Sequence, residues 1–346
     1  MSGAAAMVRA GFLARHGLSA SQLAPLAGDA SARRYWRLPG SGLLLMEDRH
    51  DRAGFAGFVQ LSLHLNALGL SAPVVRAADP ALGLALIEDF GTATYAARLA
   101  GGGDETALYA LAVDALLHLH HHAGATTIDR PDYNLAIWLD ELDIFAQWFA
   151  PAISPALNVD RFAARWRALW MPALAPLAHR HEALVLRDFH IDNLIELDGR
   201  EGIARCGLLD FQDAVLGPAE YDLVSLLQDA RRDLAPGLEA AMLRRYCAGA
   251  PDASGGAAAI GARYALAGAQ RHARIAGVFL RLARRDGKPR YLRFLPRVLG
   301  QFRAALGAAR LQDIAGFLDD SLPDWHRCGT TPATSWPARD LPWDSI

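Results

Sequence analysis

The sequence predicts an α+β protein with two lobes, a small β-rich lobe at residues 1–90 and a large, mainly helical lobe at residues 91–346. Strand-like runs and sharp turns dominate the first part, whereas long stretches of helical periodicity dominate the second. At 346 residues, of which 52% are hydrophobic, the chain is long enough and apolar enough to form a core in each lobe.

In the small lobe, residues 4–18 carry Arg9, Arg15 and His16, which indicates a short amphipathic helix rather than a secretory signal. Strand-like runs at 32–38 and 43–46 flank a Pro-Gly-Ser-Gly turn and predict a hairpin. Helical periodicity follows at 57–68. The run at 84–91 predicts a strand that ends in a glycine, and we expect a hinge between the lobes at 88–91.

In the large lobe, the periodicity predicts helices at 107–122, 135–149, 218–232, 237–248, 257–285 and 290–320. Short apolar runs at 183–186, 194–197 and 206–209 predict three strands among these helices. The Asp-Gly-Arg turn at 198–200 is expected to fold the last two strands together.

The composition excludes several classes of protein. A net charge of −2 and a pI of about 6.6 provide no basic field for nucleic acid or an anionic membrane. Three widely spaced cysteines imply neither a disulfide framework nor a CxxC metal site. No apolar run reaches the length of a membrane span. We therefore expect a cytoplasmic protein with small-molecule partners, and no obligate protein partner.

Two polar clusters follow the predicted strands of the large lobe. Asp188 and Asn193 lie on the loop between the first two strands, and Asp210 follows the third. The spacing is that of phosphoryl transfer, in which an Arg-Asp pair precedes an Asn by a fixed interval and a second Asp-Phe pair follows. An acidic hairpin whose aspartates cap turns is the alternative explanation.

This chemistry requires these residue types. Asp188 would orient an acceptor hydroxyl and take its proton. Asn193 and Asp210 would hold Mg²⁺ on the phosphates of ATP, because Mg²⁺ prefers hard oxygen ligands.

Several longer segments carry a family resemblance: 28–35, 187–194, 209–218, 221–231 and 284–288. Over nearly its whole length the chain resembles the aminoglycoside phosphotransferase/choline kinase group. Within that group it most resembles the bacterial anomeric kinases that act on N-acetylmuramate and N-acetylglucosamine. The resemblance implies a two-lobed kinase-like fold, ATP and Mg²⁺ as cofactors, and ATP-dependent formation of a sugar 1-phosphate in peptidoglycan recycling.

The resemblance also assigns roles. It makes Asp188 the catalytic residue and Asn193 and Asp210 the metal ligands. It implies that the nucleotide is bound by a phosphate-covering hairpin and an adenine hinge, which here correspond to Asp29, Ser31, Arg33 and Arg34 and to Glu88 and Phe90.

Three departures accompany this resemblance. Leu186 stands where many relatives have a structural histidine. No lysine precedes Lys288, and Met46 takes the place of the usual phosphate-binding lysine. The segment 57–68 contains no Glu, so the usual Lys–Glu pair is absent. Arg33 or Arg34 could supply the missing charge, since guanidinium binds phosphate bidentately, or both could be exposed strand residues.

Candidate acceptor-binding residues are Glu141, Asp213 and Arg271. Glu141 lies in an acidic, aromatic segment that could offer a sugar both a carboxylate and a flat apolar surface. Arg271 could meet the carboxylate of a muramic acid, and Asp213 could contact substrate or metal-bound water. A solvated acidic helix face, a surface arginine and a turn cap are the respective alternatives.

Two other functions remain as alternatives. One is a kinase of a different small alcohol, such as an aminoglycoside, choline or homoserine; the basic segment 271–297 argues against a polycationic acceptor. The other is a non-catalytic nucleotide-binding protein, suggested by the missing lysine and opposed by the intact set of Asp188, Asn193 and Asp210. The sequence does not distinguish between the two sugars or between their anomers.

Overall fold

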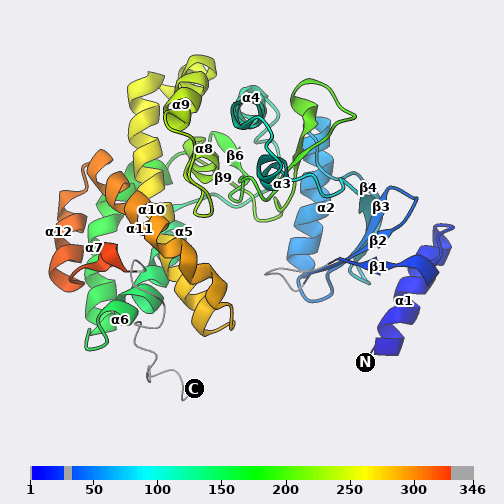
Figure 1. Ribbon diagram of the computed structural model, residues 1–346, viewed down its shortest axis with the longest axis horizontal. Coiled ribbons are helices and arrows are strands. Elements are labelled where there is room, and N and C mark those ends of the chain that lie inside the picture. Colours follow the sequence, from blue (N-terminus) through cyan, green and yellow to red (C-terminus); the bar gives the residue numbers. More distant parts are fainter. Residues whose placement is uncertain (1, 27–32, 329–346) are drawn as a thin grey trace. The chain divides into compact units, whose positions relative to one another are not determined.

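The computed structural model describes residues 2–26 and 33–328 (Figure 1). The chain forms two compact units. Unit 1 comprises residues 1–128 and 186–214, and unit 2 comprises residues 129–185 and 215–346. These units do not decide where nucleotide and acceptor binding divide, so a functional boundary at residue 90 stays a prediction. Among the described helices, none combines the length and apolar character needed to cross a membrane.

Unit 1 contains a five-stranded antiparallel sheet in the order β1-β2-β3-β5-β4. Its strands are β1 (Ala24–Pro25), β2 (Arg34–Leu38), β3 (Leu43–Glu47), β4 (Val75–Asp79) and β5 (Leu84–Glu88). The predicted hairpin is confirmed as β2 and β3, which pair from Leu38–Leu43 to Arg34–Glu47.

Helix α1 (Ser2–Arg15) packs on one face of this sheet. Phe12 and Leu13 form a buried cluster with Leu38 and Leu45. Side chains alternate along a strand, so the buried Met46 of β3 belongs to the opposite face. The two faces of the sheet therefore have different neighbours, because α1 covers only one of them.

Unit 1 contains further helices and turns and a two-stranded sheet. They are α2 (Arg52–Ala67), α3 (Tyr95–Ala100), α4 (Glu105–His121), β7 (Leu194–Glu196), β8 (Cys206–Leu208) and the 3-10 turns η1 (Ala20–Gln22) and η3 (Gly202–Arg205). Helix α2 begins earlier than predicted because Asp51 Oδ1 accepts a hydrogen bond of 2.7 Å from the backbone of Gly54. The predicted pairing of the last two strands is confirmed as β7 with β8.

Unit 2 is mainly helical. Its α-helices are α5 (Leu135–Ile144), α6 (Ala150–Ile153), α7 (Val159–Ala178), α8 (Glu220–Leu227), α9 (Leu238–Gly249), α10 (Gly256–Arg284), α11 (Leu295–Ala308) and α12 (Gln312–Ser321). A π-helical turn, η2 (Phe145–Phe149), joins α5 to α6, and 3-10 turns lie at η4 (Asp252–Ser254), η5 (Pro289–Phe294) and η6 (Trp325–Arg327). Strands β6 (Ala183–Val185) and β9 (Val215–Gly217) pair antiparallel.

Two predicted helices differ from the structure. The single helix at 290–320 is wrong, because the chain forms η5, α11 and α12, and Arg310 takes a left-handed φ of 56° between the last two. The helix at 218–232 ends at Leu227 as α8. Helix α7 and strand β9 were not expected.

Candidate active site

The predicted catalytic loop lies between β6 and β7. Arg187 adopts a left-handed φ of 70°, which turns the chain sharply just before Asp188. The backbone N–H of Asn193 donates to the carbonyl of His190 at 2.8 Å, closing the loop. The N–H of Leu209 donates to the carbonyl of Asn193 at 2.9 Å, so the hairpin of β7 and β8 places Asp210 beside this loop.

Asp188, Asn193 and Asp210 are brought together within unit 1, as predicted. The side-chain nitrogen of Asn193 lies 3.0 Å from the carbonyl oxygen of Asp188 and 3.5 Å from Oδ2 of Asp210. Asp210 has a left-handed φ of 57°, a strained conformation of a kind that recurs at functional sites. Burial raises the pKa of the Asp210 carboxyl, and the nearby charge of Asp188 adds to the increase.

A chain of polar contacts links Asp210 to Arg33, the residue directly before β2. Gln212 Nε2 donates to Asp210 Oδ1 at 2.7 Å, and Gln212 Oε1 accepts from an Nη atom of Arg33 at 2.9 Å. Arg33 Nε in turn donates to Asp48 Oδ2 at 3.1 Å. Arg33 and Asp48 are both buried, so the sheet and the catalytic hairpin are joined by a desolvated ion pair and an amide.

Helix α2 contributes aromatic rings here and no carboxylate. Phe58 of α2 stacks on Phe211, which follows Asp210, with ring centroids 5.2 Å apart. The guanidinium carbon of Arg33 lies 5.6 Å from the centre of the Phe58 ring, within cation–π range. Burial lowers the pKa of Arg33, but Tyr35 and Asp48 more than offset this, so its pKa is raised and the side chain stays charged.

The two candidate arginines lie on opposite faces of the sheet. Arg34 pairs with Glu47 across β2 and β3 and is exposed, and Glu47 contacts Arg9 of α1 at 2.9 Å. Arg33, one residue earlier, reaches Gln212 on the opposite side. Of the two arginines, the structure therefore brings only Arg33 to the predicted metal residues.

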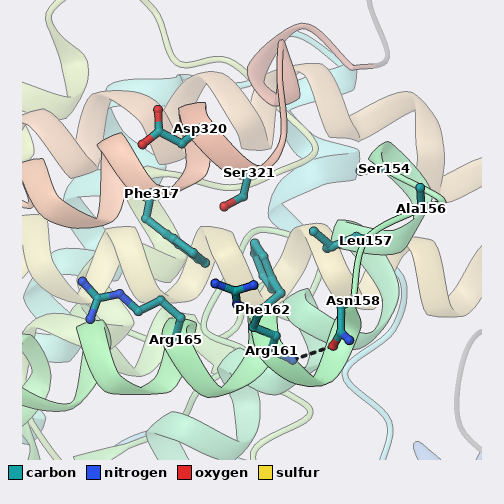
Figure 2. A pocket seen from close by; sticks show the side chains of 10 residues that line it. All are labelled: Ser154, Ala156, Leu157, Asn158, Arg161, Phe162, Arg165, Phe317, Asp320 and Ser321. Atoms are coloured by element: carbon teal, nitrogen blue, oxygen red, sulfur yellow. Dashed lines mark hydrogen bonds between the residues drawn. The ribbon is translucent and has the colours of Figure 1, made fainter.

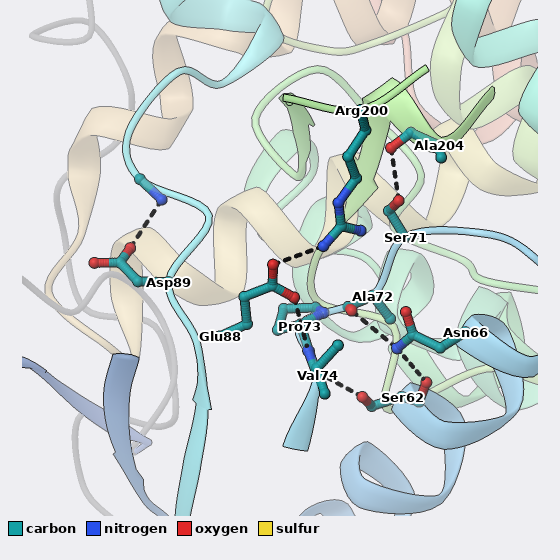
Figure 3. A network of polar contacts seen from close by, with 11 residues as sticks. Ser62, Asn66, Ser71, Ala72, Pro73, Val74, Glu88, Asp89, Arg200 and Ala204 are labelled. Carbon is teal, nitrogen blue, oxygen red and sulfur yellow. Dashed lines mark hydrogen bonds and ion pairs between the residues drawn. The ribbon is translucent and has the colours of Figure 1, made fainter. Parts of the chain in front are cut away.

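The predicted adenine hinge is held by a separate polar network (Figure 3). Glu88 accepts 2.6 Å and 3.3 Å hydrogen bonds from Arg200 and from the backbone N–H of Val74. The Arg200 guanidinium also lies 5.2 Å from the Phe90 ring centre. Since the Glu88 carboxylate is engaged, a nucleotide at this segment would meet its backbone.

Three further residues of unit 1 were predicted to bind nucleotide or acceptor, namely Asp29, Ser31 and Asp213. Asp29 and Ser31 lie outside the described residues. Asp213 is exposed in the turn after Asp210, where Ala214 donates to the carbonyl of Phe211 at 3.0 Å. Its charge contributes to the raised pKa of Asp210.

The candidate acceptor residues Glu141 and Arg271 lie in unit 2, and both are buried. Glu141 Oε2 accepts from the Tyr133 hydroxyl at 2.5 Å, and Glu141 Oε1 lies 3.4 Å from Arg274 Nε. Arg271 donates to the Tyr221 hydroxyl at 3.2 Å. The solvated acidic face and the surface arginine considered above are therefore not what the structure has at these positions.

An aromatic cluster accompanies these two residues. Tyr133 stacks on Trp138 with ring centroids 4.0 Å apart, and Tyr221 meets both rings edge-on. The Trp138 indole donates to the carbonyl of Tyr133 at 2.6 Å, which fixes the stack. Unit 2 thus combines a buried carboxylate, two arginines and three buried aromatic rings in one place.

The donor set around Asp210 fits Mg²⁺. One carboxylate and one amide are the usual protein share of an Mg²⁺ site whose other ligands are phosphate oxygens and water. The described residues contain no group of three or more His, Cys, Asp or Glu side chains suited to a metal ion. An ion held by Asn193 and Asp210 would therefore depend on the nucleotide for its remaining ligands.

A pocket of about 640 Å³ lies elsewhere in unit 2, between the start of α7 and α12 (Figure 2). Arg161, Arg165 and Asp320 supply charge to its lining, and Phe162 and Phe317 pack together with ring centroids 4.9 Å apart. None of the predicted site residues lines this pocket.

Two residues of the site were missed by the reasoning from sequence. Gln212 connects Asp210 to Arg33, and Asp48 pairs with Arg33, but neither was assigned a role. The available signal was position: Gln212 stands where kinases commonly have the glycine of Asp-Phe-Gly, and Asp48 directly follows the strand that lacks the lysine.

Comparisons with known proteins agree with this geometry. The model of the phosphotransferase enzyme family matches residues 22–259. The chain is 37% identical to an N-acetylmuramate/N-acetylglucosamine kinase of Caulobacter vibrioides, over 91% of this chain and 96% of that protein. It is 32% identical to a kinase of the same name from Neisseria meningitidis, over 80% and 83% of the two chains.

Solved structures share the fold at lower identity. A choline/ethanolamine kinase family protein from Mesorhizobium loti matches with a TM-score of 0.55 and 16% identity, over 87% of this chain and 92% of that one. An ADP-bound aminoglycoside phosphotransferase matches with a TM-score of 0.57 and 14% identity, over 87% and 98%. The predicted α+β, kinase-like fold is confirmed.

Proposed function

The chain belongs to the phosphotransferase enzyme family, and from this premise we propose that it transfers the γ-phosphoryl group of ATP to the anomeric hydroxyl of N-acetylmuramate, N-acetylglucosamine or both. The product is the sugar 1-phosphate. The observation that carries the proposal is the meeting of Asp188, Asn193 and Asp210 on one loop and one hairpin of this chain. The names of its relatives, which are kinases of these two sugars, support the choice of acceptor.

The residues would divide the chemistry as follows. The Asp188 carboxylate accepts the proton of the attacking hydroxyl and orients that oxygen toward the γ-phosphorus. The anomeric hydroxyl is more acidic than other sugar hydroxyls, so a carboxylate of ordinary basicity is adequate. Mg²⁺, when bound by Asn193 and Asp210 together with the phosphates, neutralises charge on the transferred group. Positioning and charge stabilisation supply most of the rate in such a reaction.

The nucleotide would be held without a lysine. Arg33 is the cation that contacts the Asp210 network, and it brings a fixed positive charge to the side of the sheet opposite α1. The backbone of the segment around Glu88 and Phe90 would meet the adenine, and the segment containing Asp29 and Ser31 would cover the phosphates. ATP-dependent sugar phosphorylation in the cytoplasm, in the recycling of peptidoglycan sugars, is the setting that we propose.

A panel of acceptors tests the proposal. The protein is incubated with ATP, Mg²⁺ and either N-acetylmuramate, N-acetylglucosamine or an aminoglycoside, and ³¹P–¹H coupling locates the new phosphate. We expect coupling to the anomeric proton of at least one amino sugar. Phosphate on another hydroxyl, or transfer only to the aminoglycoside, would overturn the proposal in favour of a kinase of another small alcohol. ATP binding without transfer to any acceptor would indicate a non-catalytic nucleotide-binding protein.

A further inference from the structure

One face of α10 carries a line of three arginines. Arg274, Val278, Arg281 and Arg285 are separated by four, three and four residues, so successive turns place them on the same side of the helix. Arg274 and Arg281 are partly exposed and Arg285 is exposed, whereas the neighbouring positions 275–277 and 279–280 are buried. We call these three arginines the arginine stripe.

Carboxylates are present at both ends of the arginine stripe and not in its middle. Arg274 Nε lies 3.4 Å from Glu141, and Arg285 holds Asp286 through two contacts of 2.7 Å and 3.1 Å. Arg281 lies between them, and its Nε is buried with no hydrogen-bond partner among the described residues. The Arg281 side chain is partly exposed, so an anionic ligand that reached its guanidinium would supply an acceptor that the described residues do not.

The surrounding charges favour the same conclusion. Burial lowers the pKa of Arg281, and the like charges of Arg285 and Arg274 lower it further. Asp286 has the opposite effect, but its carboxylate is already held by Arg285. An anion placed at Arg281 would relieve this repulsion, since it would be attracted by all three guanidinium groups.

The arginine stripe begins at the carboxylate that we expect to bind a sugar hydroxyl. Glu141 belongs to α5, and the end of α5 approaches α10 closely at Gly277, between Arg274 and Arg281. A Cβ atom on Gly277 would lie 2.5 Å from the carbonyl oxygen of Ile144. Arg274, which contacts Glu141, and Arg281 thus lie about two helical turns apart along one helix face, roughly 10 Å at 1.5 Å per residue.

We propose that Arg281 binds the carboxylate of an acidic amino sugar, namely the lactyl carboxylate of N-acetylmuramate. This inference rests on the proposed function and deepens it, because N-acetylglucosamine has no carboxylate. Arg281 is then a specificity-determining residue, which recognises one of the two sugars through a charge-assisted hydrogen bond and takes no part in the transfer.

The experiment compares kcat/KM for the two sugars in the full-length protein and in Arg281→Ala. We expect the variant to lose roughly ten- to hundredfold with N-acetylmuramate, the range for a hydrogen bond to a charged group. With N-acetylglucosamine the loss should be about twofold or less, which also reports that the variant is folded. Arg281→Lys should recover part of the lost preference. Arg244→Ala, which removes an exposed arginine of α9 outside the arginine stripe, is the matched control.

The possible results separate the two proposals. Equal losses with both sugars, or no loss with either, would overturn the assignment of Arg281 while leaving the sugar kinase intact. A rise in the KM for ATP with both sugars would identify the anion as a nucleotide phosphate and also overturn it. An unaltered protein that phosphorylates neither sugar would instead refute the proposed function, and this inference with it.

Discussion

Asp188 is the residue on which transfer should depend most directly. Asp188→Asn preserves the size of the side chain but removes the proton acceptor beside the acceptor hydroxyl. We expect kcat to fall by roughly 10²-fold or more, while the affinity for ATP changes little. Steady-state kinetics and nucleotide titration measure the two quantities. Asp198→Asn, which changes an exposed aspartate between β7 and β8, is the control. Near-full turnover by Asp188→Asn would remove Asp188 from the mechanism.

Asn193 and Asp210 should control the dependence on Mg²⁺. Asp210→Ala removes a carboxylate ligand and is expected to abolish turnover. Asn193→Ala removes one neutral ligand, so it should raise the Mg²⁺ concentration needed for half-maximal rate. The measurement is rate against Mg²⁺ at fixed ATP. Curves for both variants that coincide with that of the unaltered protein would contradict the assignment.

Arg33 and Arg34 form a matched pair for testing the missing lysine. Arg33 contacts the Asp210 network, whereas Arg34 is exposed beside Glu47. We expect Arg33→Ala to raise the KM for ATP about tenfold, equivalent to about 1.4 kcal/mol, and Arg34→Ala to raise it much less. Arg33→Lys should retain part of the affinity.

The Arg33→Ala variant needs a control for Asp48, the buried carboxylate that pairs with Arg33. Removing Arg33 leaves the Asp48 carboxylate buried and unpaired, which is strongly destabilising. The double variant with Asp48→Asn removes that charge, so its ATP KM reports on the loss of Arg33 without an unpaired buried carboxylate. If the double variant binds ATP as tightly as the unaltered protein, backbone N–H groups and Mg²⁺ suffice and Arg33 is structural.

At the scale of elements, the packing of α10 on α5 depends on Gly277. A methyl group there would lie 2.5 Å from the carbonyl of Ile144, and backbone cannot move aside cheaply. We expect Gly277→Ala to destabilise unit 2 by roughly 1–3 kcal/mol. Gly261→Ala on the same helix meets open space and should stabilise by about 0.5–1 kcal/mol. Urea denaturation of both variants compares them, and a similar change in the two would contradict this account.

Which elements could be predicted depended on whether their signals are local. The β2–β3 hairpin and α10 have a sharp turn or a long periodic pattern, and both appear where expected. Helix α7 was missed because Pro172 and Pro176 lie inside it, although Trp166 and Trp170 follow helical spacing after the Asn158 cap. Strand β9 has three residues and exists through pairing with β6, which no local pattern reveals.

The site was predictable to a similar extent. Spacing along the chain predicted that Asp188, Asn193 and Asp210 lie close together, because loop length fixes how a hairpin presents its ends, and the structure has them so. Spacing could not show which of Arg33 and Arg34 faces the predicted metal residues. Strand alternation places the two side chains on opposite faces of the sheet, but it does not show which face α1 covers. Gln212 and Asp48 act through contacts between residues far apart in sequence, so only the folded chain reveals them.

For the whole molecule, the unusual choice of basic residue yields a final prediction. Of the 35 basic residues, only Lys288 is a lysine, and it lies in unit 2. Phosphate binding in unit 1 must then rely on arginine side chains, backbone N–H groups and the metal ion.

An amine-specific acylating reagent should leave kinase activity largely intact, because it can reach only Lys288 and a terminal amine. The arginine reagent phenylglyoxal should inactivate the protein, and ATP with Mg²⁺ should slow this inactivation by covering the nucleotide site. Lys288→Arg under the same acylation is the control. Rapid inactivation by the amine reagent that ATP prevents, and that Lys288→Arg abolishes, would assign the phosphate charge to Lys288 and refute the role of Arg33.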